Sequence, residues 1–487
     1  MERLKQYTRV MMMAVTTMVM TACSAVDEQP ENEQVMVPEA VSFGAYVNRG
    51  TTRAGVGGPL TTDSLTTLPS AAPAYLGYHN TAGFGVFAYY TDGTRYSQLS
   101  LPNFMYNQQV AWDGSNWTYS PIKYWPNEFG GGGSSEADFL TFFAYAPYVD
   151  VSPTTGLVTA NDRCGIFGLT SSKESGDPVV KYHTNYDLTK QVDLCYGVAP
   201  AGGFSNTVTG ANPVNDIAEG QPYIDVVKPT IASQITFNFK HALAALNVQI
   251  DADMDVASHA PSSLDANTRI WVRSVTFDGF ADKGQLNLNI GNWNNLDCDC
   301  DVESRPITIY DGRRDRYEGV SASLNETAGL NPTIVQSTKY VTDGTTITSP
   351  ATTLGVTNTP VNLFDTSGWP YANPASPTDE EIEKALAAPI YVIPTNQPLR
   401  VNIVYDVETY DPKLVSQYLS DGSTNGSTIE NNITAYITDG SSDPIVLEAG
   451  KAYTVNLHLG MTSVKMEAEV TEWGVGATAT VPLPDNE

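Results

Sequence analysis

Few residues of this 487-residue sequence have the spacing that catalysis or metal binding requires. No Gly-x-Ser-x-Gly nucleophile motif, His-Glu-x-x-His zinc motif or phosphate-binding glycine loop is present. The histidines also lack the spacing of metal-ligand pairs; they are His79, His183, His241, His259 and His458. We therefore predict no enzyme, no catalytic residue, no cofactor and no metal, and we expect His241 and His458 to be structural.

The cysteines and nearby carboxylates leave two alternatives open. Cys164 and Cys195 could form a disulfide in an oxidising compartment or remain buried thiols. Asp297, Asp299 and Asp301 alternate with Cys298 and Cys300 in one turn. Carboxylates bind calcium, but the ligand spacing of an EF-hand is absent, so a calcium site is kept only as an alternative.

Composition and charge limit the class of protein. The chain is 41% hydrophobic and 10% aromatic, and only 16% of its residues are charged, which indicates an extracellular all-β protein with long loops. Its net charge of −28 opposes nucleic-acid binding, which needs a basic surface. At about 100 to 200 residues per domain, the length predicts two or three domains.

The N-terminus predicts a signal peptide (1–22) followed by a lipid-modified cysteine. Basic residues precede an apolar run at 10–20 that is too short to span a bilayer. The stretch Met20-Thr21-Ala22-Cys23 then resembles a bacterial lipobox, with Met where Leu is usual. We expect acyl chains such as palmitate on the Cys23 thiol. Ordinary signal cleavage after Ala22, without a lipid, is the alternative.

Residues 23–38 are polar and acidic after Cys23, so they cannot bury enough apolar surface to fold. We expect a flexible tether there. Asp27 and Glu28 resemble the acidic signal that directs some lipoproteins to the outer face of the outer membrane. No later segment reaches about 18 apolar residues, so we predict no transmembrane helix.

The first predicted strand ends in an exposed loop with two arginines. Val41, Phe43, Ala45 and Val47 alternate with more polar positions, which indicates a strand with one buried face. The loop that follows holds Arg49 and Arg53 among small residues. Such loops are preferred sites of proteolytic cleavage, and either arginine would suit a trypsin-like protease.

Residues 101–148 are the most aromatic part of the chain. They predict three strands, with a turn at Asp113-Gly114-Ser115-Asn116 and a glycine-rich connection at 126–133. Aromatic residues suit a half-buried pleated surface, so we interpret this stretch as β-sandwich core. An aromatic platform for sugars or peptides is the alternative.

The remaining strands are predicted from alternation. Strands are expected at 84–90, 192–197 and 235–250, the last with a kink or bulge at the HALAAL segment. A hairpin is predicted from 271–277 and 284–290, and a helix at 378–388. Four further strands or strand pairs close the chain at 390–393, 399–407, 432–437 and 452–473. This pattern indicates β-sandwiches with Greek-key order.

Several motifs together resemble the fimbrillin family, the lipoprotein-derived subunits of type V pili. They are the lipobox at Cys23, the Thr52-Arg53-Ala54 loop, and the runs WTYSPIKYWP, LTFFAYAP, FKHALAAL, APIYVIP and AGKAYTVNLHLG, the last followed by a strand ending at Trp473. They occur in family order over almost the whole chain. The resemblance implies two transthyretin-like Greek-key β-sandwich domains in tandem, which we expect at 39–230 and 231–487.

The resemblance also implies a maturation route. An Arg-specific protease would cleave after Arg53 or Arg49, Arg53 being nearer the family pattern, and the strand 41–47 would be lost. A C-terminal strand of the next subunit would fill the gap; here Ala477, Ala479, Val481 and Leu483 alternate suitably, although Pro482 suits only a strand end.

The implied partners are other pilin subunits, the Arg-specific protease, the outer membrane through the lipid anchor, and a host or bacterial surface ligand for an adhesive tip subunit. The implied location is the outer membrane surface and then the fimbrium. The role as stalk, tip or anchor stays open. The alternative function is a monomeric outer-membrane lipoprotein that binds glycans.

Overall fold

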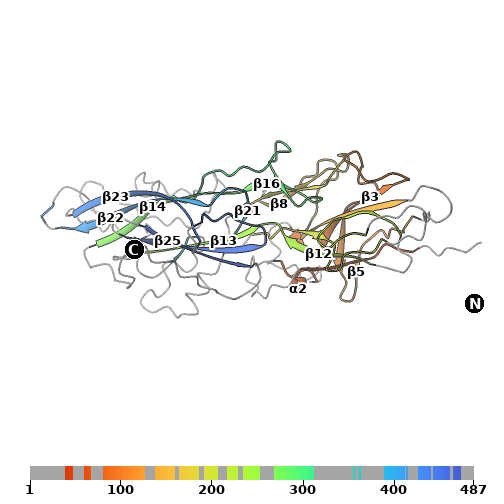
Figure 1. The fold of residues 1–487 in the computed structure, drawn as a ribbon, viewed down its shortest axis with the longest axis horizontal. Coiled ribbons are helices and arrows are strands. Elements are labelled where there is room, and N and C mark those ends of the chain that lie inside the picture. The colour runs from red at the N-terminus through yellow and green to blue at the C-terminus, as the bar shows by residue number, and fades with distance from the viewer. Residues whose placement is uncertain are drawn as a thin grey trace, which may run out of the picture. The chain divides into compact units, whose positions relative to one another are not determined.

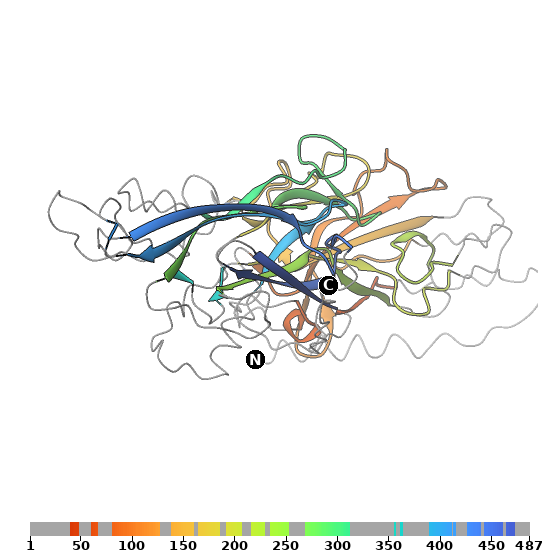
Figure 2. The ribbon, with the colours of Figure 1, turned by 60° about the vertical axis from the view of Figure 1, so that its left-hand side comes forward.

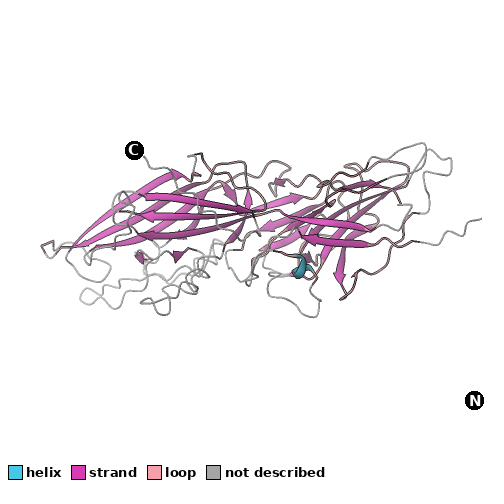
Figure 3. Cartoon of the chain, turned by 60° about the horizontal axis from the view of Figure 1, so that its bottom comes forward, coloured by secondary structure: helices cyan, strands magenta, loops and turns pink. Residues whose placement is uncertain are grey.

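The computed structural model describes residues 39–47, 60–66, 80–126, 138–159, 164–185, 191–206, 216–228, 234–252, 268–311, 355–356, 361–363, 389–411, 413–414, 426–439, 443–460 and 464–472. Over these residues the chain is all-β, as the sequence predicts: the strands form five sheets (Figure 3). One short helix, α2 (Thr62–Leu65), follows β1 among the described residues. No described helix is long and apolar enough to cross a membrane.

The largest sheet has eight strands, all from the first half of the chain (Figure 1). Its order is β1 (Phe43–Val47), β12 (Ile235–His241), β10 (Cys195–Val198), β6 (Phe139–Ala146), β3 (Phe84–Thr91), β4 (Met105–Trp112) and β5 (Trp117–Thr118), and β11 (Tyr223–Val226) also pairs with β6. β1 runs parallel to β12, whereas the neighbouring pairs from β12 to β5 are antiparallel.

Two smaller sheets accompany it. One has the order β17 (Trp293–Asn294), β16 (Lys283–Asn287), β9 (Val179–His183) and β8 (Gly165–Leu169). The other pairs β2 (Asn80–Thr81) with β7 (Tyr148–Val149).

The later part of the chain forms a six-stranded and a five-stranded sheet. The first has the order β15 (Phe280–Ala281), β21 (Ile390–Pro394), β13 (Ala244–Ala252), β24 (Lys451–Leu459) and β25 (Val464–Glu472), with β20 (Val361–Asn362) on β13. The second has the order β18 (Ile307–Asp311), β14 (Thr268–Asp278), β22 (Arg400–Tyr410) and β23 (Gly426–Tyr436), with β19 (Gly355–Val356) on β14. β22 and β23 lie side by side as long blue strands in Figure 2.

Three apolar clusters form the core, and strand alternation assigns residues to them. In β6, Phe142 belongs to one cluster and Phe143 to another, because successive side chains of a strand point to opposite faces. β3 divides in the same way between Val86 and Phe87. Burial on both faces explains why these two strands are nearly unbroken apolar runs. The third cluster fills the space between the six-stranded and five-stranded sheets.

The aromatic stretch 101–148 is core, as predicted. It forms β4, β5 and β6, and the turn at 113–116 joins the first two. Trp125, Phe142 and Phe143 are among its buried rings, while Tyr124 is exposed. The buried rings therefore stabilise the first sheet, whereas others, such as Trp112 and Trp117, are half-buried.

The run 235–250 links the sheets. It forms β12 in the eight-stranded sheet and β13 in the six-stranded one, with the predicted break at Ala242 and Leu243. The Trp293 indole N–H donates to the Ala242 carbonyl at 2.8 Å, which satisfies one backbone group at the break. β12 follows residue 230 but pairs with β1 and β10, which precede it, so the eight-stranded sheet extends across the predicted boundary. The division into two domains at 230 stays a prediction.

The predicted hairpin of 271–277 with 284–290 is wrong. β14 pairs with β18, β19 and β22, whereas β16 pairs with β9 and β17 in another sheet. The reason is that Phe277 and Leu286 pack in different apolar clusters, and β15 between them pairs with β21. The helix predicted at 378–388 lies outside the described residues.

We expect Phe142→Ala to lower the free energy of unfolding by about 3–5 kcal/mol, because the ring is fully buried in the first sheet and its loss leaves a cavity. Urea denaturation of the purified protein measures this. Leu99→Ala is the control: Leu99 is 85% exposed, so its change should stay within about 0.5 kcal/mol. Equal effects of the two variants would contradict the assignment of this core.

Candidate functional site

Residues 39–47 connect the two ends of the eight-stranded sheet. β1 pairs with β12 in a register that runs from Phe43 opposite Ile235 to Val47 opposite Phe239. Just before β1, the Val41 N–H donates to the Lys123 carbonyl at 2.9 Å, and the Trp125 N–H donates to the Glu39 carbonyl at 2.9 Å. Lys123 and Trp125 follow β5, the last strand of the sheet. This short segment, which we call the closing segment (39–47), therefore bonds to both ends.

Phe43 is the main side chain of the closing segment. Its ring is 1% exposed and lies 5.4 Å from Tyr119, 5.9 Å from Phe142 and 6.1 Å from Phe237, measured between centroids. Burying a phenylalanine contributes about 1.5–3 kcal/mol, and edge-on or offset aromatic pairs add to this. Phe43 therefore holds β1 against the aromatic core.

Side chains from other elements hold the backbone of the closing segment. The Tyr119 hydroxyl donates to the Val41 carbonyl at 2.7 Å. Burial raises the pKa of Tyr119, so the hydroxyl keeps the proton that it donates. At the other end, the Thr62 hydroxyl accepts from the Val47 N–H at 3.0 Å and donates to the Val47 carbonyl at 3.2 Å. Both ends of the segment thus have side-chain partners.

Gly44 allows the closing segment to lie close to its neighbours. A Cβ at this position would lie 2.6 Å from Gln234 Oε1 and 2.9 Å from Thr236 Oγ1. The Gln234 side-chain amide also donates to the Phe43 carbonyl. A larger residue opposite Thr236 would therefore require the Gln234 and Thr236 side chains to shift.

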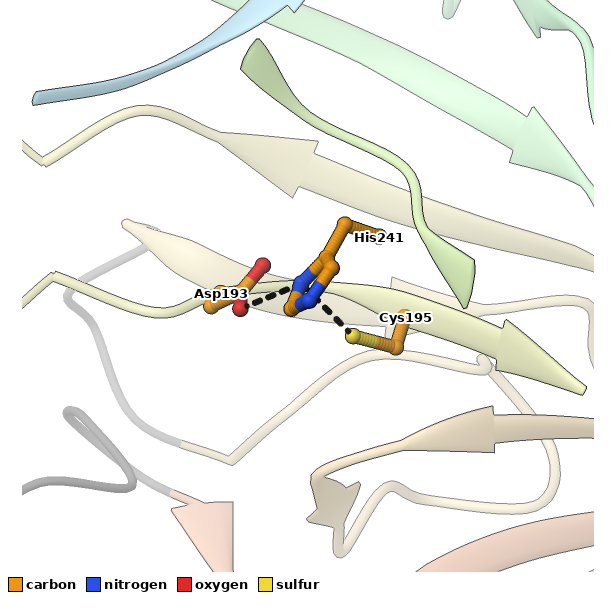
Figure 4. A group of neighbouring side chains, drawn as sticks. All are labelled: Asp193, Cys195 and His241. Atoms are coloured by element: carbon orange, nitrogen blue, oxygen red, sulfur yellow. Dashed lines mark hydrogen bonds and ion pairs between the residues drawn. The ribbon is translucent and has the colours of Figure 1, made fainter. Parts of the chain in front are cut away.

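A buried polar group lies beside Leu60, the first described residue after Val47. The Leu60 N–H donates to Asp193 Oδ2 at 2.6 Å. The same oxygen lies 2.8 Å from His241 Nδ1, and Cys195 Sγ lies 3.4 Å from that nitrogen (Figure 4). Cys195 and His241 are register partners on β10 and β12, which places their side chains together. Burial, with Asp193 nearby, raises the pKa of the Cys195 thiol well above its usual value.

The structure places four predicted site residues together. Val41, Phe43 and Val47 are buried and Ala45 is half-buried, and all four pack in one apolar cluster. Their role as an exchanged strand stays a prediction. The other predicted site residues lie outside the described residues: Cys23, Arg49, Arg53, Ala477, Ala479, Val481 and Leu483.

The described cysteines differ in whether they form disulfides. Cys164 and Cys195 are both thiols and form no disulfide. Cys298 and Cys300 are joined to each other. In the same turn, Asp299 accepts a hydrogen bond from the Asn294 side chain at 2.7 Å.

Sequence reasoning missed residues that hold the closing segment and residues of the buried polar group beside Leu60. Thr62 lies in a Thr-rich stretch with no distinguishing signal. Asp193 and Cys195 are two positions apart, a spacing that puts both on one face of an extended chain. That signal could have paired them with each other, but nothing in the sequence indicated that His241 and Leu60 meet them.

Comparison with known families decides what kind of protein carries this arrangement. The sequence model of the family described as fimbrillin-like matches residues 77–328, just over half of the chain. The chain belongs to the fimbrillin-like family. This membership agrees with the prediction from the sequence motifs and with the absence of a predicted catalytic site.

Single relatives of this fimbrillin-like protein match it over a short segment or at low sequence identity. The Fimbrium subunit Fim1C of Phocaeicola vulgatus is 39% identical over 70 residues, which are 14% of this chain and 16% of that relative's length. A fimbrial protein from Bacteroides vulgatus aligns with a TM-score of 0.48 at 18% identity, covering 89% of this chain and 99% of that one. A fimbrilin from Porphyromonas gingivalis aligns at 0.31 and 11%, covering 90% and 99%.

Thr62→Val should loosen the end of the closing segment in this fimbrillin-like protein, because Val47 loses both hydrogen bonds to the hydroxyl. The cost is about 1 kcal/mol of local opening free energy, which corresponds to roughly fivefold faster hydrogen exchange at the Val47 amide. Thr66→Val is the control, since that hydroxyl bonds carbonyls of α2. Unchanged exchange in Thr62→Val would show that the hydroxyl does not hold β1.

Proposed function

We propose that this chain is a structural subunit of a cell-surface pilus, in the stalk or at an adhesive tip, and that it polymerises by exchange of a β-strand. Membership of the fimbrillin-like family supports the first part. The position of β1 at the sheet edge, bonded along one side to β12, supports the second and is the observation that carries it.

Removal of the closing segment would create a receptor site for another strand. β12 would lose its parallel partner and expose unpaired N–H and C=O groups along one edge. The Phe43 ring would leave a vacant position among Tyr119, Phe142 and Phe237. An added strand would supply main-chain bonds for affinity and alternate side chains for specificity.

The donor in this proposal is the strand 477–483 of the next subunit. Its residues Ala477, Ala479, Val481 and Leu483 would face the groove that the closing segment leaves. Other pilin subunits are thus the partners, in a homopolymer or a heteropolymer.

The precursor in this proposal is a lipoprotein on the outer membrane surface. Acyl chains on Cys23 anchor it there until a protease cleaves after Arg53 or Arg49 and releases the closing segment. The released subunit then enters the fimbrium. Trp125, Phe142 and Phe143 of the aromatic stretch are buried in the core, and no observation favours glycan binding as a second function.

The N-terminal residue of subunits in sheared surface filaments tests cleavage. We expect Ala54, or Gly50 if Arg49 is cut, by mass spectrometry, because both bonds follow an arginine in the loop that the sequence predicts after β1. The double variant Arg49→Ala, Arg53→Ala should accumulate as an uncleaved precursor and form no filaments. Arg305→Ala is the control, being an exposed arginine elsewhere. Filament subunits that begin at Cys23 would contradict the proposal that the first strand is removed.

Deletion of residues 474–487 tests the donor strand. The deletion variant should be secreted and cleaved but stay monomeric in size-exclusion chromatography, because it lacks the strand that fills the next subunit's groove. Deletion of 484–487 alone is the matched control and should polymerise. Filaments of normal length from the larger deletion would exclude this segment as the donor.

A further inference from the structure

Three side chains with metal-binding atoms gather at the end of β12, outside the closing segment. Asp193, Cys195 and His241 each offer one ligand atom, and these atoms lie within 4.8 Å of one another. Figure 4 shows the imidazole between the carboxylate and the thiol. Asp193 is 5% exposed and Cys195 is fully buried, while the His241 side chain is 10% exposed. The group is thus buried, with one ligand close to the surface.

The buried carboxylate of Asp193 has unmet bonding capacity. Oδ2 accepts from Leu60 and contacts His241, but Oδ1 is buried and has no hydrogen-bond partner among the residues that the structure describes. Buried charges in proteins are paired or bind metals, because leaving a charge unsolvated costs several kcal/mol. This orphaned oxygen, beside a thiol and an imidazole, points to a cation as the missing partner.

The ligand types and their distances fit a small thiophilic ion. A tetrahedral Zn²⁺ site with bonds of about 2.0 Å to N and O and about 2.3 Å to S separates N from O by about 3.3 Å and N from S by about 3.5 Å. The observed separations from His241 Nδ1 are 2.8 Å to Asp193 Oδ2 and 3.4 Å to Cys195 Sγ. The N–S separation is thus within about 0.1 Å of the tetrahedral value and the N–O separation about 0.5 Å below it, so Asp193 would have to move slightly away from His241 on binding.

We propose that Asp193, Cys195 and His241 bind one divalent ion of the zinc type, with a fourth ligand from solvent on the exposed side of His241. On binding, the Cys195 S–H bond breaks, its proton passes to solvent, and an S–metal bond forms. A carboxylate, a thiolate and a neutral imidazole around a dication give a group with no net charge, which suits its burial. The sequence predicts no metal, because these three residues are brought together only by strand pairing.

The ion would join three parts of the chain. It bonds β10 through Cys195 and β12 through His241, and Asp193 in turn accepts the Leu60 N–H. Leu60 is the first described residue after Val47, so it follows Arg49 and Arg53 in the chain. The site would therefore attach to the sheet the start of the chain that remains after cleavage. This role is separate from strand exchange, so it can be tested without filaments.

Cobalt titration tests the site. The sample is the full chain with Cys23→Ser, freed of metal with a chelator. We expect one Co²⁺ per chain with an ultraviolet thiolate-to-cobalt absorption band, displacement of that band by Zn²⁺, and a higher melting temperature with Zn²⁺. Loss of even a supporting partner weakens metal binding about 10–100-fold, so Cys195→Ser should abolish the band and weaken binding at least that much.

Two comparisons make the result decisive. Cys164→Ser is the matched control, because Cys164 is the other described thiol and lies 3.9 Å from His183 Nδ1; it should keep the band. Asp193→Asn should keep the thiolate-to-cobalt band but weaken Co²⁺ binding. Because this variant retains the Cys195 thiol, its weaker binding would support the site even if Cys195→Ser has a fold defect. No thiolate band in the parent protein, or a band that survives Cys195→Ser, would overturn the proposal and leave the three residues as a hydrogen-bonded group.

Discussion

The main-chain groups along the outer edge of β12 are the constraint on which the first half of the fold depends. A central strand must be paired on both sides, and β12 obtains its second partner from β1. The chain supplies that partner with a short segment that also bonds the residues after β5. The Phe43 ring then fills the adjacent core position. The closing segment thereby pairs the backbone groups of β12, joins the two ends of the sheet and completes an apolar cluster.

The contribution of the closing segment is nevertheless local. Its apolar residues belong to one of the three described clusters, the one that contains Phe84, Phe142 and Phe237. The opposite faces of β3 and β6 pack in a second cluster through Phe87 and Phe143. A third cluster fills the sandwich of β13 and β14 with their neighbours. Two of the three clusters thus contain no residue of the closing segment, so most of the core does not depend on it.

Sequence reasoning succeeded where the information is local. The period-two alternation of 41–47 and the unbroken apolar run of β6 predict strands without reference to the rest of the chain, and the HALAAL segment predicts the break before β13. It failed where the partner is remote. The hairpin was wrong because β14 and β16 pack in different clusters, and neighbouring strands in sequence need not pair.

The site shows the same division. Val41, Phe43, Ala45 and Val47 were identified by their pattern and lie in one apolar cluster. The residues that hold them were not, because Thr62 and Tyr119 contact the closing segment only through the folded backbone. Asp193 and His241 are 48 positions apart in the chain, and only the pairing of β10 with β12 brings them within bonding distance.

The direction of β1 has an energetic consequence for any strand that takes its place. β1 is parallel to β12, and parallel ladders have slanted hydrogen bonds that are slightly less stable per residue than antiparallel ones. A strand entering the same position in the opposite direction would make the more stable ladder. β1 is thus held to β12 by the slightly weaker of the two ladder geometries.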